Sequence, residues 1–111
     1  MNKKLLLIAI GVFGFCSNAN SDATNSIVTR ITVLDDVAFI KVTPVPATRP
    51  TCSDNGAWHY AFNVTNDTGK STFSLALAAY AAKTKVTVKS KNICTHYPNM
   101  EDVQYLILEE T

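Results

Sequence analysis

The residues best suited to acid–base chemistry are the two histidines, His59 and His96. A general base must lie within hydrogen-bond reach of the group that it deprotonates. His59 stands in an alternating aromatic stretch, on the side opposite Trp58 and Tyr60, which predicts an exposed imidazole. His96 lies close to Cys94, but a Cys–His nucleophile needs a free thiolate. The sequence therefore indicates no nucleophile–base pair, and we expect that the chain is not an enzyme.

Two further patterns resemble catalytic motifs but lack an essential part. The tripeptide Gly-Lys-Ser at 69–71 matches the last three residues of a phosphate-binding loop. That motif also needs a glycine five residues before Gly69, where this chain has Val64. Glu101 and Asp102 are adjacent, so on a strand their carboxylates would point to opposite faces and make a poor acid–base pair. We expect no nucleotide chemistry and no cofactor.

Two cysteines, Cys52 and Cys94, stand in the body of the chain. In an oxidising compartment two such thiols form one disulfide. Closing the long loop between them would add about 4 kcal/mol to the stability in the chain-entropy model. A metal site at Cys94 and His96 is the alternative, but structural zinc needs four convergent ligands and the CxxC spacing is absent. We expect the disulfide and no metal.

The first nineteen residues have the layout of a secretory signal peptide. Two lysines precede an eleven-residue run without polar side chains, Leu5–Phe15, and small residues then precede a cleavage site between Ala19 and Asn20. As a helix this run would span about 16 Å, whereas a bilayer core needs about 20 residues. We expect a secreted or periplasmic protein with no membrane span after cleavage.

Two alternatives remain at this end of the chain. Cleavage could instead follow Ala23, where a second small residue stands. Cys16 could carry a lipid, although Phe15 is a poor match to the small residue that usually precedes a lipidated cysteine.

The composition is that of one small globular domain. The chain has 111 residues, 47% hydrophobic and 17% charged. Removing Lys3 and Lys4 from the ten basic residues leaves eight against nine acidic ones. A net charge near −1 does not favour nucleic acid or anionic membrane surfaces as partners.

Hydrophobic periodicity predicts five strands and one helix in the order β-β-β-α-β-β. We expect a flexible N-terminus at 20–26 and a single domain over 27–111. The expected strands are 27–34, 37–43, 57–64, 85–89 and 103–108, and the expected helix is 70–83, capped by Asp67 or Thr68. Phe73, Leu77 and Tyr80 recur at helical spacing and should pack on the sheet, leaving the alanine-rich side free for a second copy.

A small five-stranded OB-type barrel, mostly β with one helix and one disulfide, would bury both sets of apolar residues and reduce exposed strand edges. The alternative is one helix packed on an open sheet.

Aromatic and polar neighbours suggest where a ligand could bind. Trp58 alternates with Phe62, so we expect it in the core, whereas Tyr97 precedes a proline in a loop and should lie at the surface. The candidate ligand contacts are His59, His96 and Tyr97.

The sequence resembles a group of small exported bacterial proteins over about residues 27 to 108. The residues that carry the resemblance are AWHYAFN at 57–63, TGKS at 68–71, LALAAYAAKTKVTV at 75–88, Cys94, and EDVQY at 101–105. The layout is also similar to the B subunits of subtilase-type and pertussis-like toxins, which are OB-type barrels that form pentameric rings and bind host glycans. The chain has no clear match to their sugar-contacting residues, so no binding residue is transferred.

The resemblance implies an exported, non-enzymatic binding subunit that recognises a glycan or a protein. Its expected partners are further copies of itself, a glycan, or an exported catalytic subunit. The alternative is an accessory or structural protein of the cell envelope without a small ligand.

Overall fold

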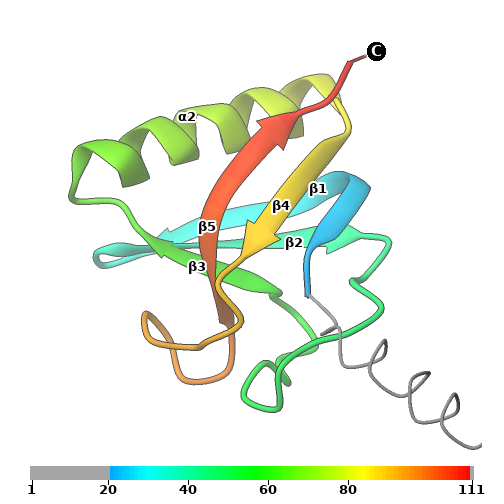
Figure 1. The fold of residues 1–111 in the computed structure, drawn as a ribbon. Helices are drawn as coiled ribbons and strands as arrows, with labels where there is room; N and C mark the ends of the chain where they lie inside the picture. Colours follow the sequence, from blue (N-terminus) through cyan, green and yellow to red (C-terminus); the bar gives the residue numbers. More distant parts are fainter. Residues whose placement is uncertain (1–20, 111) are drawn as a thin grey trace, which may run out of the picture.

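Five strands and one helix make up residues 21–110, the part of the chain that the computed structural model describes (Figure 1). Their order, β-β-β-α-β-β, is the predicted one. The expected signal peptide, with Cys16 and the Ala19–Asn20 bond, lies outside the described residues. The elements are β1 (Ala23–Leu34), β2 (Val37–Thr43), β3 (Tyr60–Asn63), α2 (Asp67–Ala82), β4 (Val86–Ser90) and β5 (Glu101–Leu108).

The strands form a closed ring in the order β1-β2-β3-β5-β4 (Figure 1). Neighbouring strands are antiparallel except β3 and β5, which are parallel. The ring closes because the long β1 pairs with β2 along most of its length and with β4 near its beginning. The alternative of a helix on an open sheet is therefore wrong.

Strand β1 begins earlier than predicted. Ala23 and Ser26 pair with Val88 and Val86 of β4, so these residues belong to the sheet and not to a flexible N-terminus. The segment is polar and has no apolar alternation, so only the pairing with a distant strand reveals it. At the other side of the ring, β3 begins at Tyr60, three residues later than the predicted strand.

A β-bulge changes which face of β1 each residue occupies. The register shifts between Val28, which pairs with Val42, and Arg30, which pairs with Lys41. In a regular strand Val28 and Arg30 would lie on the same face, whereas the extra residue at the bulge places them on opposite faces. Val28 is buried in the ring while Arg30 is exposed on the outer face.

Two apolar clusters lie on opposite sides of the sheet. The larger cluster fills the ring, and the smaller one lies on the outer face of β2 and β3. The ring cluster includes Val28, Ile40, Val42, Tyr60, Phe62, Ala76, Ala79, Val86, Val88, Val103 and Leu106. The outer cluster contains Phe39, Ala61 and Met100, with Val37, Trp58 and Tyr97 packed against it. Trp58 therefore does not share a core with Phe62, contrary to the prediction, because the regular strand starts only after it.

Helix α2 begins at Asp67 because Asn66 caps it. The Asn66 side-chain oxygen accepts a hydrogen bond from the Gly69 N–H at 2.7 Å, which satisfies one of the free donors of the first turn. The predicted caps, Asp67 and Thr68, are instead the first residues of the helix. The helix ends at Lys83, which adopts the left-handed conformation with φ 56°.

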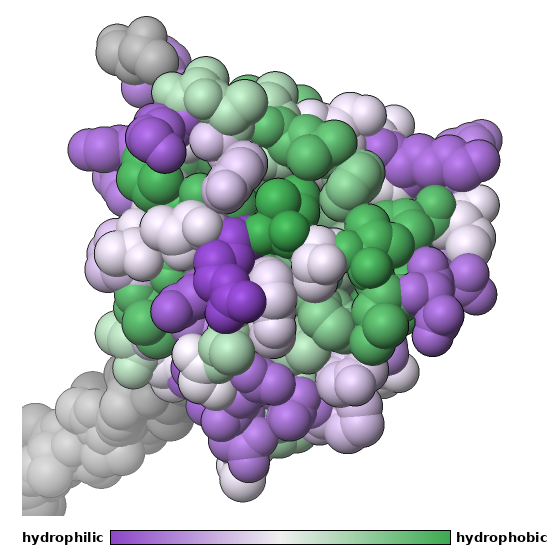
Figure 2. All heavy atoms as spheres, turned by 180° about the vertical axis from the view of Figure 1, so that it is seen from behind, coloured by the Kyte–Doolittle hydropathy of each residue, from purple (hydrophilic) through white to green (hydrophobic). Residues whose placement is uncertain are grey.

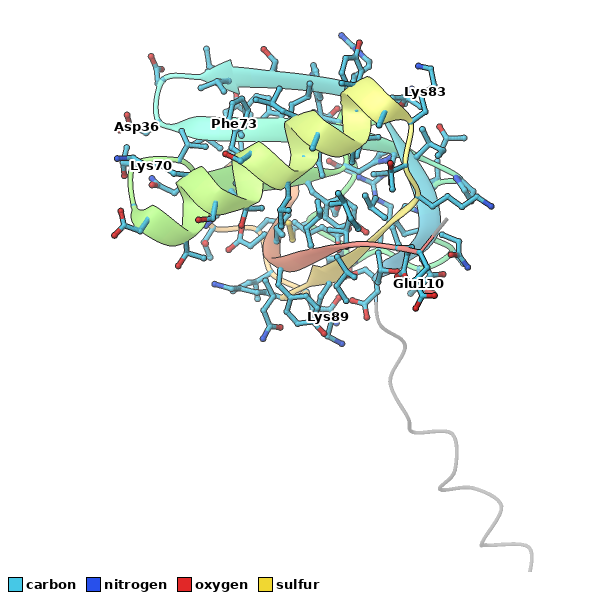
Figure 3. All side chains as sticks on the ribbon, turned by 90° about the horizontal axis from the view of Figure 1, so that it is seen from above. Asp36, Lys70, Phe73, Lys83, Lys89 and Glu110 are labelled. Carbon is cyan, nitrogen blue, oxygen red and sulfur yellow. A yellow bond between two sulfur atoms is a disulfide. The ribbon has the colours of Figure 1, made fainter. Side chains whose placement is uncertain are left out.

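The helix packs on the ring with its small residues. Viewed from above, it lies across one opening of the ring (Figure 3). Its buried residues are Gly69, Ala76 and Ala79. Of the three larger residues that were expected to pack on the sheet, Phe73 is partly buried against the ring cluster. Leu77 and Tyr80 are 43% and 42% exposed, so the prediction is wrong for these two. The small side chains let the helix approach the strands closely, which turns the larger residues toward the flanks.

Candidate functional site

Three aromatic rings meet on the outer face of the sheet, and we call the surface formed by Phe39, Trp58 and Tyr97 the aromatic face. The centroids of the Phe39 and Tyr97 rings are 4.8 Å apart in an edge-to-face arrangement. Those of Phe39 and Trp58 are 5.9 Å apart, with the ring planes tilted by 56°. Phe39 is buried, whereas Trp58 and Tyr97 are only partly buried. A buried ring thus supports two rings that keep part of their surface in solvent.

Two cations stand beside the aromatic face. The guanidinium carbon of Arg30 lies 4.3 Å from the centroid of the Trp58 ring, a cation–π contact. Lys41 is directly opposite Arg30 across the β1–β2 ladder. The ion pairs within residues 21–110 join other cations to carboxylates, so neither Arg30 nor Lys41 has an acidic partner there.

His59 is buried, which contradicts the prediction of an exposed imidazole; the residue is 2% exposed. The imidazole Nδ1 accepts a hydrogen bond from the Val42 backbone N–H at 3.2 Å, and the backbone N–H of His59 donates to the Ile40 carbonyl at 2.9 Å. Burial, followed by the charges of Arg49 and Lys41, lowers the pKa of His59 to about 4. A neutral, enclosed imidazole completes the β2 edge and offers no surface to a ligand.

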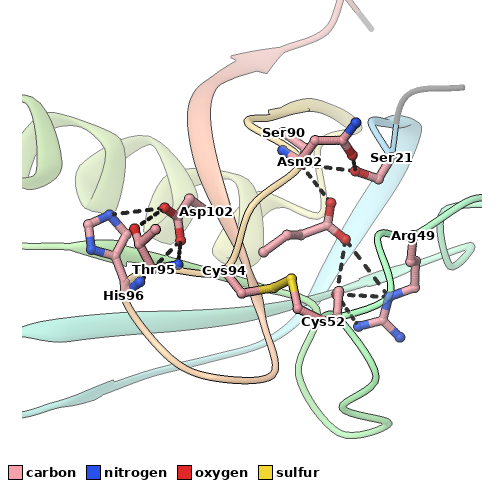
Figure 4. The surroundings of a disulfide bond; sticks show 11 residues. Ser21, Arg49, Cys52, Ser90, Asn92, Cys94, Thr95, His96 and Asp102 are labelled. Carbon is pink, nitrogen blue, oxygen red and sulfur yellow. Dashed lines mark hydrogen bonds and ion pairs between the residues drawn. A yellow bond between two sulfur atoms is a disulfide. The ribbon is translucent and has the colours of Figure 1, made fainter. Parts of the chain in front are cut away.

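His96 and Tyr97 lie in the loop between β4 and β5, which Asp102 holds in place (Figure 4). The buried Asp102 carboxylate accepts hydrogen bonds from the backbone N–H groups of Thr95 and His96, at 2.9 and 3.2 Å, and from the Thr95 hydroxyl. His96 Nε2 lies 4.0 Å from the same carboxylate. The loop that presents Tyr97 is therefore fixed to the start of β5.

Glu101 joins the end of β4 to the proline-rich loop after β2. Its fully buried carboxylate accepts hydrogen bonds from Ser90 at 2.6 Å and Ser53 at 3.1 Å, and Arg49 Nε lies 3.8 Å away. Glu101 and Asp102 therefore contact separate sets of residues, as their adjacency predicted.

The predicted disulfide between Cys52 and Cys94 is confirmed, with a Cα–Cα distance of 6.1 Å (Figure 4). It joins the proline-rich loop after β2 to the loop that carries His96 and Tyr97. Together with the two buried carboxylates, the covalent link holds the surroundings of Tyr97 rigid.

A polar pocket of about 320 Å³ opens on the other side of His96, between the beginning of α2, the end of β3 and the start of β5. His96 and Lys91 contribute from the β4–β5 loop, and amide and hydroxyl side chains supply most of the remainder. The polar side chains that line it include Asn63, Asn66, Thr72 and Gln104. His96 and Tyr97, consecutive in the sequence, thus belong to different surfaces.

Sequence reasoning identified Tyr97, but it assigned Trp58 to the core and missed Phe39, Arg30 and Lys41. The positions of these three follow from the register of β1 and β2, and the bulge that sets that register leaves no local signal in the sequence.

Within residues 21–110, no three His, Cys, Asp or Glu side chains are grouped so that they could hold a metal ion. In the same part of the chain, no helix has the length and apolar character needed to cross a membrane. Comparisons with protein-family models, curated proteins and solved structures give no match.

Proposed function

We propose that the chain is an exported, non-enzymatic binding subunit with an OB-type fold, and that it recognises a glycan or a protein through the aromatic face. The strand order β1-β2-β3-β5-β4, with the helix between β3 and β4, supports the OB-type assignment. Folds of this type bind oligosaccharides and oligonucleotides on the surface of strands 2 and 3 and on the loops beside it.

The aromatic face is the observation that carries this proposal. Phe39 belongs to β2, Trp58 immediately precedes β3, and Tyr97 comes from the β4–β5 loop. Aromatic rings with one apolar surface and one polar group suit ligands that are both apolar and hydroxylated, such as sugars. Seen from the side opposite to that of Figure 1, the molecule presents strongly hydrophilic side chains among hydrophobic ones (Figure 2).

The rigid loops favour binding over catalysis. Recognition residues often lie on loops that a stable scaffold positions, and here the disulfide and the buried Asp102 carboxylate hold the loop of Tyr97. A secreted or periplasmic location would give the oxidising conditions in which this disulfide persists.

The exposed flanks of the helix suit a further copy of the chain or an exported catalytic subunit. Leu75, Leu77 and Tyr80 are each more than 40% exposed. Assembly into an oligomer would cover these residues and would multiply weak ligand sites into a tight one.

A glycan-array and protein-ligand screen with the folded mature protein tests the proposal. Trp58→Ala and Tyr97→Ala should each weaken binding at least tenfold, because each removes a ring of the aromatic face. Tyr105→Ala is the matched control, since this tyrosine is 46% exposed on β5 and lies outside the aromatic face.

Tyr97→Ala also removes the ring contact with Phe39, so its binding must be compared at a temperature where the variant is fully folded. A monomeric protein that binds nothing in this screen would contradict the proposal and would favour an accessory protein of the cell envelope.

A further inference from the structure

The direct pairing of two cations, Arg30 and Lys41, does not contribute to the stability of the fold. The two residues are directly opposite in an antiparallel ladder, on the outer face. Like charges in this arrangement destabilise a sheet. Within residues 21–110 neither side chain forms an ion pair with a carboxylate.

The bulge in β1 creates this pair. Without the extra residue between Val28 and Arg30, the ladder would place Thr29 opposite Lys41 and would turn Arg30 toward the ring. Bulges commonly occur where a strand must redirect a side chain next to a functional site. The irregularity therefore brings a second cation to the surface beside Trp58.

The contact with Trp58 orients Arg30 while leaving its donors free. The guanidinium lies over the ring at 4.3 Å, and stacking of this kind uses none of its five N–H groups. Among the described residues, neither the Arg30 nor the Lys41 side chain donates a hydrogen bond to a protein group. The hydroxyl of Thr29 does bond to Lys41, but only to its backbone carbonyl. Arg30 is exposed and Lys41 is partly exposed, so two sets of unused donors lie on the outer face that carries two partly exposed aromatic rings.

We propose that Arg30 and Lys41 bind the anionic group of a charged sugar residue whose ring lies against the aromatic face. This inference rests on the proposed function, because it names the kind of glycan that the same surface would select. The planar fork of arginine matches a carboxylate or sulfate oxygen pair, and lysine adds a point charge.

The charge distribution favours a single anionic group over a polyanion. The mature chain has no excess of basic residues, and Arg49, a further cation near His59, already lies beside Glu101. Two free cations can neutralise one group but cannot follow the backbone of a nucleic acid, which needs many phosphate contacts. The neighbouring aromatic rings favour a sugar over a simple ion.

The test uses the folded mature protein and an array of sugars in matched pairs, each neutral sugar beside its carboxylated and its sulfated form. We expect at least tenfold preference for one charged form, and we expect that affinity to fall as salt is raised. Arg30→Gln and Lys41→Gln should each reduce the affinity about tenfold or more and abolish the preference. Lys70→Gln, which removes an exposed lysine at the start of α2, should change neither.

Thermal stability separates this role from a structural one. Lys41→Gln removes a like-charge contact, so its unfolding midpoint should stay unchanged or rise, whereas a structural lysine would lower the midpoint on removal. Equal binding of neutral and charged sugars, or undiminished binding by both variants, would overturn the inference but leave the proposed function intact. Absence of any sugar binding would overturn the inference, and binding of acidic peptides alone would show that the cations select a protein instead. Absence of both sugar and protein binding would overturn the proposed function as well.

Discussion

The imidazole of His59 takes the place of a backbone carbonyl for Val42: its Nδ1 accepts the Val42 N–H at 3.2 Å. A protonated ring would have two donors and no acceptor, so it could not make this bond. The edge of β2 therefore depends on a neutral histidine.

Acidification should weaken the fold through His59. Its pKa is about 4 in the folded protein and 6.5 in the unfolded chain, so between these values the unfolded state binds more protons. Stability should be intact above about pH 6.5 and should fall as the pH drops toward 4, with a loss of roughly 1–3 kcal/mol at pH 4.5. Chemical denaturation from pH 7.5 to 4.5 measures this loss.

His59→Gln provides the control, because glutamine can accept the same N–H but does not titrate in this range. The variant should show a flatter dependence of stability on pH than the wild type between pH 6.5 and 5. Parallel curves for the two proteins would show that His59 is not the titrating group.

Gly69 should not tolerate a side chain. A Cβ at this position would overlap the Asn63 carbonyl oxygen and lie 2.8 Å from its carbonyl carbon, and backbone atoms cannot turn aside as a flexible side chain can. Gly69→Ala should therefore cost about 3 kcal/mol or more by forcing the helix away from β3. Gly56→Ala is the control, since no atom lies within 4 Å of its Cβ position, and it should change stability by less than about 0.5 kcal/mol.

Leu77 should contribute to assembly and little to folding. With 43% of the residue exposed, Leu77→Ala should cost less than about 1 kcal/mol in the free energy of unfolding. In contrast, Ala76→Leu should destabilise by about 1–3 kcal/mol, because Ala76 is fully buried against the ring. Denaturation curves of the two variants give the comparison.

If the helix flank mediates assembly, Leu77→Asp should also lower the mass of the protein in solution while leaving it folded. A cost for Leu77→Ala as large as that expected for Ala76→Leu would show that the helix packs in the opposite orientation.

The disulfide should account for a large share of the stability. Cys94→Ser should lower the free energy of unfolding by roughly 2–5 kcal/mol. Without the disulfide, the segment between Cys52 and Cys94 is no longer a closed loop in the unfolded chain, which therefore gains conformational entropy. Two free thiols in native exported protein would contradict this assignment.

The first residues after the expected cleavage site should be essential to the fold. Ser21 and Ala23 are 1% and 2% exposed, and the Ser21 carbonyl accepts a hydrogen bond from the buried Tyr60 hydroxyl at 2.7 Å. Cleavage after Ala23 would remove this acceptor, and a buried hydroxyl without a partner costs about 1–3 kcal/mol. We therefore expect the exported protein to begin at Asn20.

Thermal unfolding of two chains, one beginning at Asn20 and one at Thr24, measures the contribution of this segment. The shorter chain should melt at a lower temperature. Isolation of a stable exported protein whose first residue is Thr24 would contradict the prediction.

The sequence by itself determined the elements whose causes are local. A second β-rich run after a short polar turn predicted β2, and helix-forming residues after a polar turn predicted α2 to within a few residues. The pairing of Cys52 with Cys94 followed from there being two cysteines in the body of the chain, which allow a single intramolecular bond. The adjacency of Glu101 and Asp102 was enough to predict that their carboxylates diverge.

Only the tertiary structure decided what depends on contacts between distant segments. The prediction that Leu77 and Tyr80 face the sheet was wrong, because larger side chains gain more from burial in general. Here α2 buries Gly69, Ala76 and Ala79 instead, and at Gly69 the approach of Asn63 leaves no room for a side chain. The polar start of β1 becomes a strand only because β4 pairs with it. The candidate site also depends on contacts between distant segments. The bulge after Val28 places Arg30 beside Trp58, and the sequence around Arg30 does not predict this strand register.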